Sequence, residues 1–111
     1  PFIITEWYTK GEDTALPNRT GAGWNVHTQK DRGYFYQNFC IELLGNKNCV
    51  GWHWFKYQDN DPSDMSTDIS NRDSNKGIVD SSYEPYRDLL QQMKELNNNV
   101  WNLIWWYDHK K

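Results

Sequence analysis

The chain has few cysteines, almost no charge imbalance and no long apolar run. Its two cysteines, Cys40 and Cys49, are too few for a disulfide scaffold and lack the second pair that a zinc site needs, so both are expected to be buried thiols. A formal net charge of only −3 predicts neither a nucleic-acid partner nor an anionic membrane surface. No apolar segment approaches the ~20 residues of a membrane span, and the chain opens directly on a strand with no visible secretion signal.

At 111 residues the chain fits one domain and falls well below the ~250 residues of a complete (β/α)8 barrel. A barrel would therefore be present only in part. The unusual feature is the aromatic content, with 7 Trp and 7 Tyr in a polar chain. Flat rings on a polar surface suit the apolar faces of sugars, although large rings fill protein cores as often.

The order of predicted elements indicates an α/β fold. Residues 2–6 and 49–55 are apolar strands without polar alternation, as in a parallel sheet covered on both faces. Residues 29–44 have helical periodicity and end before Gly45, where a left-handed residue usually closes a helix; Gly33 inside them indicates close packing or a later start. Pro85 is expected to open a helix over residues 85–96. A third helix over 100–107 is aromatic around much of its surface.

Long loops over residues 9–23 and 58–82 follow the two strands, on the side where α/β folds place their active sites. The first strand ends on Glu6, beside Trp7 and Tyr8. A carboxylate held there suits the nucleophile of a retaining glycosidase, whose partner acid stands ~5 to 5.5 Å away. No second carboxylate is evidently set in that role, and a strand-end acid by itself is more often ion-paired or at the surface.

The second strand carries Trp52, His53 and Trp54. Because side chains alternate along a strand, either both Trp or the His points into a barrel, and the pattern leaves both possibilities open. A Trp there would form the floor on which a sugar stacks while His53 hydrogen-bonds a hydroxyl. The plainer interpretation of His53 is a core histidine with satisfied partners.

Two polar motifs have simpler explanations than function. The acidic run over residues 59–64 lacks the glycine and closing glutamate of an EF-hand, so we expect a solvated loop and no metal site. Asn18-Arg19-Thr20 matches a glycosylation acceptor, a pattern that often occurs by chance. No cofactor site is expected.

Five segments carry a family resemblance. They are Ile-Thr-Glu-Trp-Tyr at 4–8, Gly-Ala-Gly-Trp at 21–24 with Thr-Gln at 28–29 and Arg-Gly at 32–33, Phe-Tyr-Gln-Asn-Phe at 35–39, Val-Gly-Trp-His-Trp-Phe-Lys-Tyr at 50–57 running into Asp-Asn-Asp-Pro at 59–62, and Ser-Asn-Lys-Gly-Ile-Val at 74–79. In this order they resemble the C-terminal part of the β-agarases of glycoside hydrolase family 50. Those enzymes are clan A retaining glycosidases with a (β/α)8 catalytic barrel.

The resemblance implies that residues 1–111 are a C-terminal fragment of the catalytic TIM barrel, formed by its last two βα units. Glu6 would end the seventh strand and act as nucleophile, with Trp7, Trp52, His53 and Trp54 as substrate-binding residues and 52–55 in the eighth strand. The general acid would lie at the end of the fourth strand, which this chain lacks, so the piece alone is expected to have almost no activity. The implied reaction is hydrolysis of β-glycosidic bonds in agarose, agaro-oligosaccharides or related galactans, in a secreted or periplasmic enzyme.

Two other function classes stay open. A non-catalytic carbohydrate-binding module would use the same aromatics, although such modules are mostly β-sandwiches and the predicted helices argue against one. A partner-binding α/β protein would dock residues 101–107 on another chain, as the remainder of a barrel also would.

Overall fold

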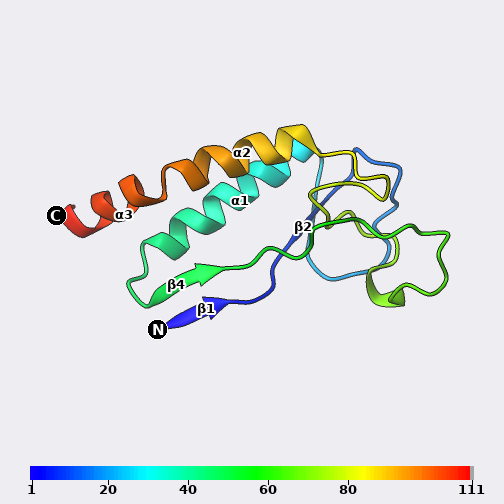
Figure 1. Cartoon of the computed structure of the whole chain (residues 1–111), viewed down its shortest axis with the longest axis horizontal. Coiled ribbons are helices and arrows are strands. Elements are labelled where there is room, and N and C mark those ends of the chain that lie inside the picture. Colours follow the sequence, from blue (N-terminus) through cyan, green and yellow to red (C-terminus); the bar gives the residue numbers. More distant parts are fainter. Residues whose placement is uncertain (111) are drawn as a thin grey trace.

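The computed structural model describes residues 1–110 and is a mixed α/β structure. Figure 1 shows helices α1 and α2 lying side by side over strands β1 and β4, with the long loops gathered beyond the ends of these strands. In chain order the elements are β1 (Phe2–Ile4), β2 (Thr9–Gly11), β3 (Trp24–Val26), α1 (Gln29–Leu44), β4 (Cys49–Trp52), a 3-10 turn η1 (Ile69–Asn71), α2 (Arg87–Asn98) and α3 (Val100–His109).

Strands β1 and β4 pair in parallel, which confirms the predicted parallel arrangement, and α1 lies between them in the sequence. Both strands are shorter than expected, because regular pairing stops where Ile4 meets Trp52. Beyond this point the chains stay joined by single bonds: the His53 N–H donates to Ile4 O at 2.8 Å and the Phe55 N–H to Trp7 O at 3.0 Å. In this irregular extension the residues after Ile4 and Trp52, including Glu6 and His53, leave the sheet and enter the loops.

A second parallel pair, β2 with β3, joins the loop after β1 to the segment before α1. Each strand has three residues, too few to show alternation, which explains why the sequence pattern predicted only a loop there.

Helix α1 has the predicted bounds, Gln29–Leu44. It begins with a capping box in which the Asp31 N–H donates to Thr28 Oγ1 at 3.1 Å and the Thr28 N–H donates to Asp31 Oδ2 at 3.2 Å. Gly33 marks close packing within the helix, because a Cβ at this position would lie 2.5 Å from Gln92 Cβ on α2. The expectation of a left-handed Gly45 was wrong: its φ is −73°, and the lack of a side chain instead makes room for the Tyr107 ring, 2.9 Å from where a Cβ would lie.

Helix α2 begins at Arg87 and not at Pro85. Pro85 forms an antiparallel bridge with Val79, and the Tyr86 N–H donates to Ile78 O at 3.0 Å. These contacts hold the chain extended until Tyr86, so the helix starts two residues later than the proline pattern predicted. At its other end α2 is separated from α3 by Asn99 alone.

The core lies between the sheet and the helices and is built around Trp7. Its ring stacks on Phe39 with centroids 4.2 Å apart and on Tyr36 at 5.4 Å, and meets Trp54 edge-on at 5.0 Å. Cys40, as predicted, is fully buried here, whereas Cys49 is half-buried. Six residues form the buried cluster: Trp7, Tyr36, Cys40, Leu89, Met93 and Leu96.

Among residues 1–110 only one face of the β1–β4 sheet is covered by helices (Figure 1), and Phe2, Ile3 and Val50 are exposed. The expectation of a sheet covered on both faces is therefore not met within the described chain. Helix α3 also leaves Trp101 and Trp105 exposed. No helix in the described part is long and apolar enough to cross a membrane.

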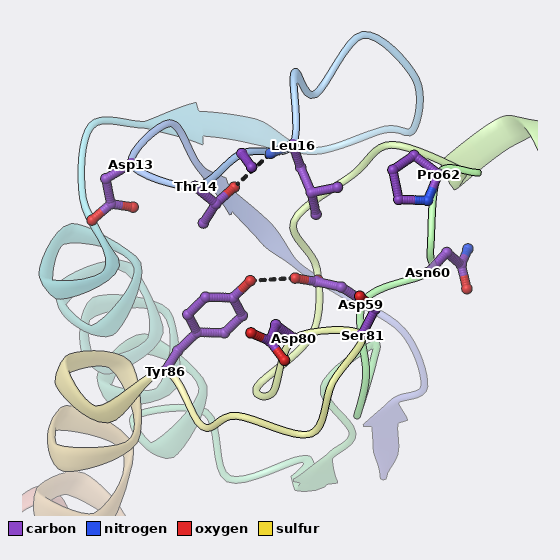
Figure 2. A pocket seen from close by; sticks show the side chains of 10 residues that line it. Asp13, Thr14, Leu16, Asp59, Asn60, Pro62, Asp80, Ser81 and Tyr86 are labelled. Carbon is purple, nitrogen blue, oxygen red and sulfur yellow. Dashed lines mark hydrogen bonds between the residues drawn. The ribbon is translucent and has the colours of Figure 1, made fainter. Parts of the chain in front are cut away.

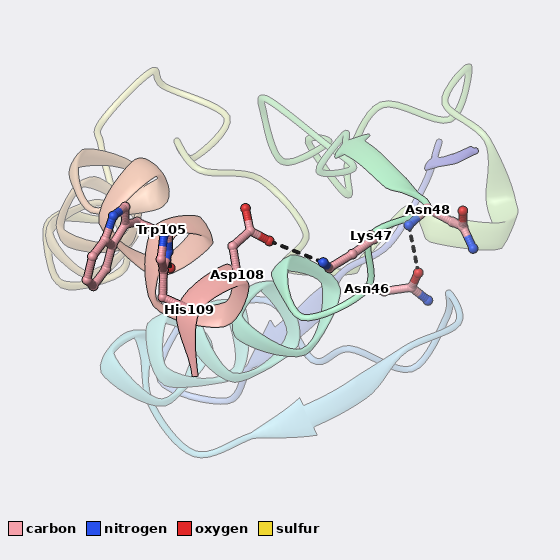
Figure 3. A network of polar contacts seen from close by, with 6 residues as sticks. All are labelled: Asn46, Lys47, Asn48, Trp105, Asp108 and His109. Carbon is pink, nitrogen blue, oxygen red and sulfur yellow. Dashed lines mark hydrogen bonds and ion pairs between the residues drawn. The ribbon is translucent and has the colours of Figure 1, made fainter. Parts of the chain in front are cut away.

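The end of α3 is tied to the loop between α1 and β4 (Figure 3). Lys47 Nζ lies 3.8 Å from Asp108 Oδ1, and this is the only ion pair found within residues 1–110. Both groups are exposed, so the pair contributes little to stability. The ring of His109 stacks on Trp105 with centroids 4.3 Å apart.

Candidate active site

The segments that follow β1 and β4 bring four side chains together: Glu6, Tyr8, Phe55 and Lys76. The rings of Tyr8 and Phe55 meet edge-on with centroids 6.0 Å apart. Lys76 Nζ lies 3.8 Å from the Tyr8 ring centroid and 5.7 Å from that of Phe55. Glu6 is exposed and near enough for its charge to raise the pKa of Lys76. None of the four belongs to the core beneath the helices.

The sequence predicted Glu6 as the last residue of the first strand, whereas β1 ends at Ile4 and leaves Glu6 two residues beyond it. Its carboxylate forms no ion pair with another described residue. A carboxylate in this setting is free to meet a ligand from the solvent side.

The structure resolves the alternation at the second strand. Trp52 and Trp54 face the helices: the Trp52 indole donates to the Tyr36 hydroxyl at 3.1 Å, and the Trp54 ring packs against Trp7. His53 lies between them in the sequence and is exposed, as expected for a side chain on the opposite face. His53 is therefore not a core histidine.

The rings of Trp7, Trp52 and Trp54 consequently lie on the helix side of the sheet. Trp7 is 7% exposed, and the two others line a cavity of about 410 Å³ between β4 and the helices, together with Tyr36, Met93 and Asn97. This cavity does not include Glu6. The three rings therefore pack between the sheet and the helices. Their contact with sugar stays a prediction.

A buried polar network supports the two loops from below. Asp59, 3% exposed, accepts hydrogen bonds from Gly77 N at 2.7 Å, Asn75 Nδ2 at 3.0 Å and the Tyr86 hydroxyl at 2.5 Å. Asn75 Oδ1 in turn accepts from Gly11 N at 3.0 Å, which links the loop after β4 to β2. The side-chain oxygens of Asp59 and Asn75 therefore all have partners, whereas Thr9 Oγ1 and Arg32 Nη2 are buried without one.

Arg32 occupies the centre of this network and is fully buried. Its guanidinium lies between the rings of Trp54 and Tyr86, at 5.6 and 5.7 Å, and donates to Thr9 O at 3.0 Å and Gly77 O at 2.9 Å. Burial lowers the pKa of Arg32 to about 10, and the charge of Asp59 partly offsets this. Arg32 thereby joins α1 to both loops.

A cavity of about 390 Å³ opens beside this network (Figure 2), and Glu6 is not among the residues that line it. Asp13, Asp59 and Asp80 line it together with Ser81 and Tyr86, and the Tyr86 hydroxyl points at the Asp59 carboxylate. Within residues 1–110 no group of three or more His, Cys, Asp or Glu is arranged to hold a metal ion. The Asp59 oxygens are already engaged, so the cavity wall is mainly structural.

The structure also shows the surroundings of the glycosylation-like motif at Asn18 and of the acidic run over residues 59–64. Asn18 is buried, its Nδ2 donates to Gly11 O at 2.8 Å and its Oδ1 accepts from Asn75 N at 2.7 Å, so its amide is occupied by the fold. In the acidic run the prediction of a solvated loop is correct for residues 61–64 and wrong for Asp59, which is buried in the network. Asp61 and Asp64 accept hydrogen bonds from Ser63 and Ser66, and these bonds lower the pKa of both carboxyls.

The sequence places Lys76 in a polar loop that could reach a polysaccharide but needs no such explanation, and it does not indicate the ring pair beneath Lys76. Lys76 lies far along the chain from Glu6, inside a polar loop without periodicity. The available signal was its place in the Ser-Asn-Lys-Gly-Ile-Val segment, which is part of the family resemblance.

Comparisons with known proteins were made at the level of family, sequence and structure. No protein-family model matches the chain, and no curated protein matches its sequence. A crystal structure of BpGH50 shares 48% sequence identity with a TM-score of 0.84, over 97% of this chain and 21% of that one. An exo-β-agarase structure shares 26% identity with a TM-score of 0.75, over 92% of this chain and 13% of that one.

The agarase AgWH50C has a similar fold, with a TM-score of 0.76 at 21% identity over 92% of this chain and 15% of that one. The chain thus spans about a fifth or less of the length of the solved proteins that it matches.

Proposed function

The chain belongs to glycoside hydrolase family 50, as a fragment, and on this basis we propose that it supplies the nucleophile and one wall of the sugar site of a retaining glycosidase. The observation that carries the proposal is the position of Glu6 at the loop end of β1, in a chain 48% identical to BpGH50. In this proposal Glu6 attacks the anomeric carbon, the leaving oxygen takes a proton from an acid outside this chain, and water then releases the glycosyl group from Glu6.

The proposed architecture is part of a (β/α)8 barrel, with β1 and β4 as its seventh and eighth strands and residues 1–111 as the end of the catalytic domain. The parallel pairing of β1 with β4 supports this, because neighbouring barrel strands are parallel. The rest of the barrel would cover the exposed face of the β1–β4 sheet and provide the general acid.

The proposed substrate is agarose or its oligosaccharides. The support is the likeness to an exo-β-agarase and an agarase, and such a substrate is a neutral galactan outside the cell, so we also propose secretion. His53 is proposed to hydrogen-bond a sugar hydroxyl. Trp7, Trp52 and Trp54 are kept as proposed residues of the sugar site, with their rings forming the layer behind Glu6.

The test compares the wild type with Glu6→Gln in the longest natural protein that contains the chain, using agaro-oligosaccharides. We expect Glu6→Gln to abolish turnover while oligosaccharide binding measured by calorimetry persists. Glu12→Gln is the matched control, because Glu12 is an exposed acid beyond β2, and it should retain wild-type turnover. A mechanism-based 2-fluoro galactoside should add its glycosyl mass to the peptide that contains Glu6.

Turnover that survives Glu6→Gln would refute the nucleophile assignment. Binding without turnover in both forms would instead support a non-catalytic carbohydrate-binding protein.

A further inference from the structure

Resting on the proposed glycosidase function, we propose that Lys76 contacts the substrate directly, its ammonium donating hydrogen bonds to hydroxyl oxygens of the sugar unit held at Glu6. Lys76 would thereby be a specificity-determining residue of the site. Three features of Lys76 support this role: its burial, its lack of an acceptor and its position relative to Glu6.

Lys76 is 4% exposed, yet its ammonium has no hydrogen-bond acceptor and no ion-pair partner among residues 1–110. The Nζ atom of Lys76 has no partner but is not fully buried, so the ammonium keeps some exposure to solvent. A charged donor without an acceptor is stabilised by a hydrogen bond to an oxygen atom of a ligand.

The two neighbouring lysines have their acceptors within the fold. Lys10 Nζ donates to Gly21 O at 2.7 Å, and Lys56 Nζ donates to Asn60 Oδ1. Lys76 differs from both, because the group beneath its ammonium is the face of the Tyr8 ring at 3.8 Å. A ring face stabilises a cation but leaves its outward N–H groups free.

The backbone of Lys76 is held firmly beside β4. Its carbonyl accepts from the Trp54 indole at 3.0 Å and from the Lys56 N–H at 3.1 Å, and its own N–H donates to Ser74 O at 3.0 Å. A donor on a well-anchored backbone is preorganised for a ligand, and preorganisation lowers the entropy lost on binding.

The charge of Glu6 raises the pKa of Lys76, although the two groups form no ion pair. Tyr8 follows Glu6 by two residues, and its ring centroid lies 3.8 Å from the Lys76 ammonium, so the ammonium sits over the segment that carries the carboxylate. Neither group has an ion-pair partner among residues 1–110, and both are left free for a third group. A sugar ring whose anomeric carbon faces Glu6 carries hydroxyl oxygens on its neighbouring carbons, and these are the acceptors that Lys76 lacks. A neutral hydroxyl suffices, so the inference is compatible with agarose.

The experiment uses Lys76→Met in the longest natural protein, because methionine keeps the apolar stem over Tyr8 and removes the donors. We expect kcat/KM on agaro-oligosaccharides to fall on the order of 10- to 100-fold, the effect of one charge-assisted hydrogen bond, with no decrease in the thermal midpoint. Lys47→Met is the matched control, since Lys47 is exposed at the far loop between α1 and β4, and it should stay within about twofold of wild type.

A second measurement separates this inference from the proposed function. Oligosaccharide binding to Glu6→Gln and to Glu6→Gln/Lys76→Met, measured by calorimetry, should differ by a similar factor whether or not Glu6 is the nucleophile. Equal affinities would overturn the role of Lys76, whereas turnover by Glu6→Gln would overturn only the nucleophile assignment. If Lys76→Met lowers the thermal midpoint, Lys76→Arg decides: retained affinity supports the inference, and a loss as large as in Lys76→Met contradicts it.

Discussion

The Tyr86 hydroxyl donates a hydrogen bond of 2.5 Å to the Asp59 carboxylate, joining the residue before α2 to the loop after β4. Burial is the main cause that raises the pKa of Tyr86, and the bond to Asp59 adds to it. The phenol therefore stays protonated and remains a donor throughout the physiological range.

Tyr86→Phe should destabilise the fold by about 1.5 to 3 kcal/mol, the usual contribution of a hydrogen bond to a charged group. Chemical denaturation of the longest natural protein measures this free energy of unfolding. Tyr83→Phe is the control: Tyr83 is exposed and should change stability by less than about 0.5 kcal/mol. Equal stability of the two variants would show that the bond contributes nothing.

Gly77→Ala should be more damaging than Gly51→Ala. A Cβ at Gly77 would lie 2.4 Å from the Asp59 amide nitrogen and 2.4 Å from Val79 O, both backbone atoms that cannot move alone. We expect a loss of about 1 to 3 kcal/mol, as for other overpacked sites. At Gly51 the nearest atom, Ile3 Cδ1, is 3.7 Å away, so that variant should keep the wild-type thermal midpoint; a similar shift in both would contradict the packing argument.

Cys40 should resist alkylation in the native protein. Burial raises the pKa of its thiol to about 12, so at pH 8 only about one molecule in ten thousand carries the reactive thiolate. Cys49 is half-buried and should react with iodoacetamide first, as read by peptide mass spectrometry. Unfolding in denaturant should bring the two rates together, and equal rates in the native state would contradict the buried position of Cys40.

Substrate affinity should decrease at alkaline pH. Burial lowers the pKa of Lys76, the charges of Lys10 and Lys56 lower it further, and those of Glu6 and Asp68 partly offset the effect. Because only the protonated ammonium donates hydrogen bonds, substrate affinity is highest below the pKa of Lys76 and falls as the pH rises through it. Since this pKa is lowered, the fall begins at a lower pH than the titration of an exposed lysine would give. In Lys76→Arg the guanidinium stays protonated, so the alkaline loss in a pH series of calorimetric affinities should move upward. If affinity falls at the same alkaline pH in Lys76→Arg as in the wild type, Lys76 is not the titrating group.

Much of the fold followed from local pattern. The periodicity of residues 29–44 predicted α1 with its bounds, and the apolar runs predicted both strands of the parallel pair. The start of α2 was misplaced, because the bridge between Pro85 and Val79 is a long-range contact that no local pattern reveals. For the site, the sequence placed Glu6 near the end of the first strand, because that position depends on where an apolar run ends, although the strand itself stops at Ile4.

The sequence by itself determined the element order, the family resemblance and the acid at the mouth of β1. Only the tertiary structure decided that Trp52 and Trp54 turn toward α1 while His53 turns away. Alternation along a strand predicts that neighbouring side chains lie on opposite faces, but it does not say which face the helices cover. The tertiary structure also decided that the Lys76 ammonium lies over the Tyr8 ring, in the segment that carries Glu6. That contact depends on a long irregular loop held by Asp59, Asn75 and Arg32, whose hydrogen bonds join residues distant in sequence and leave no periodic trace in it.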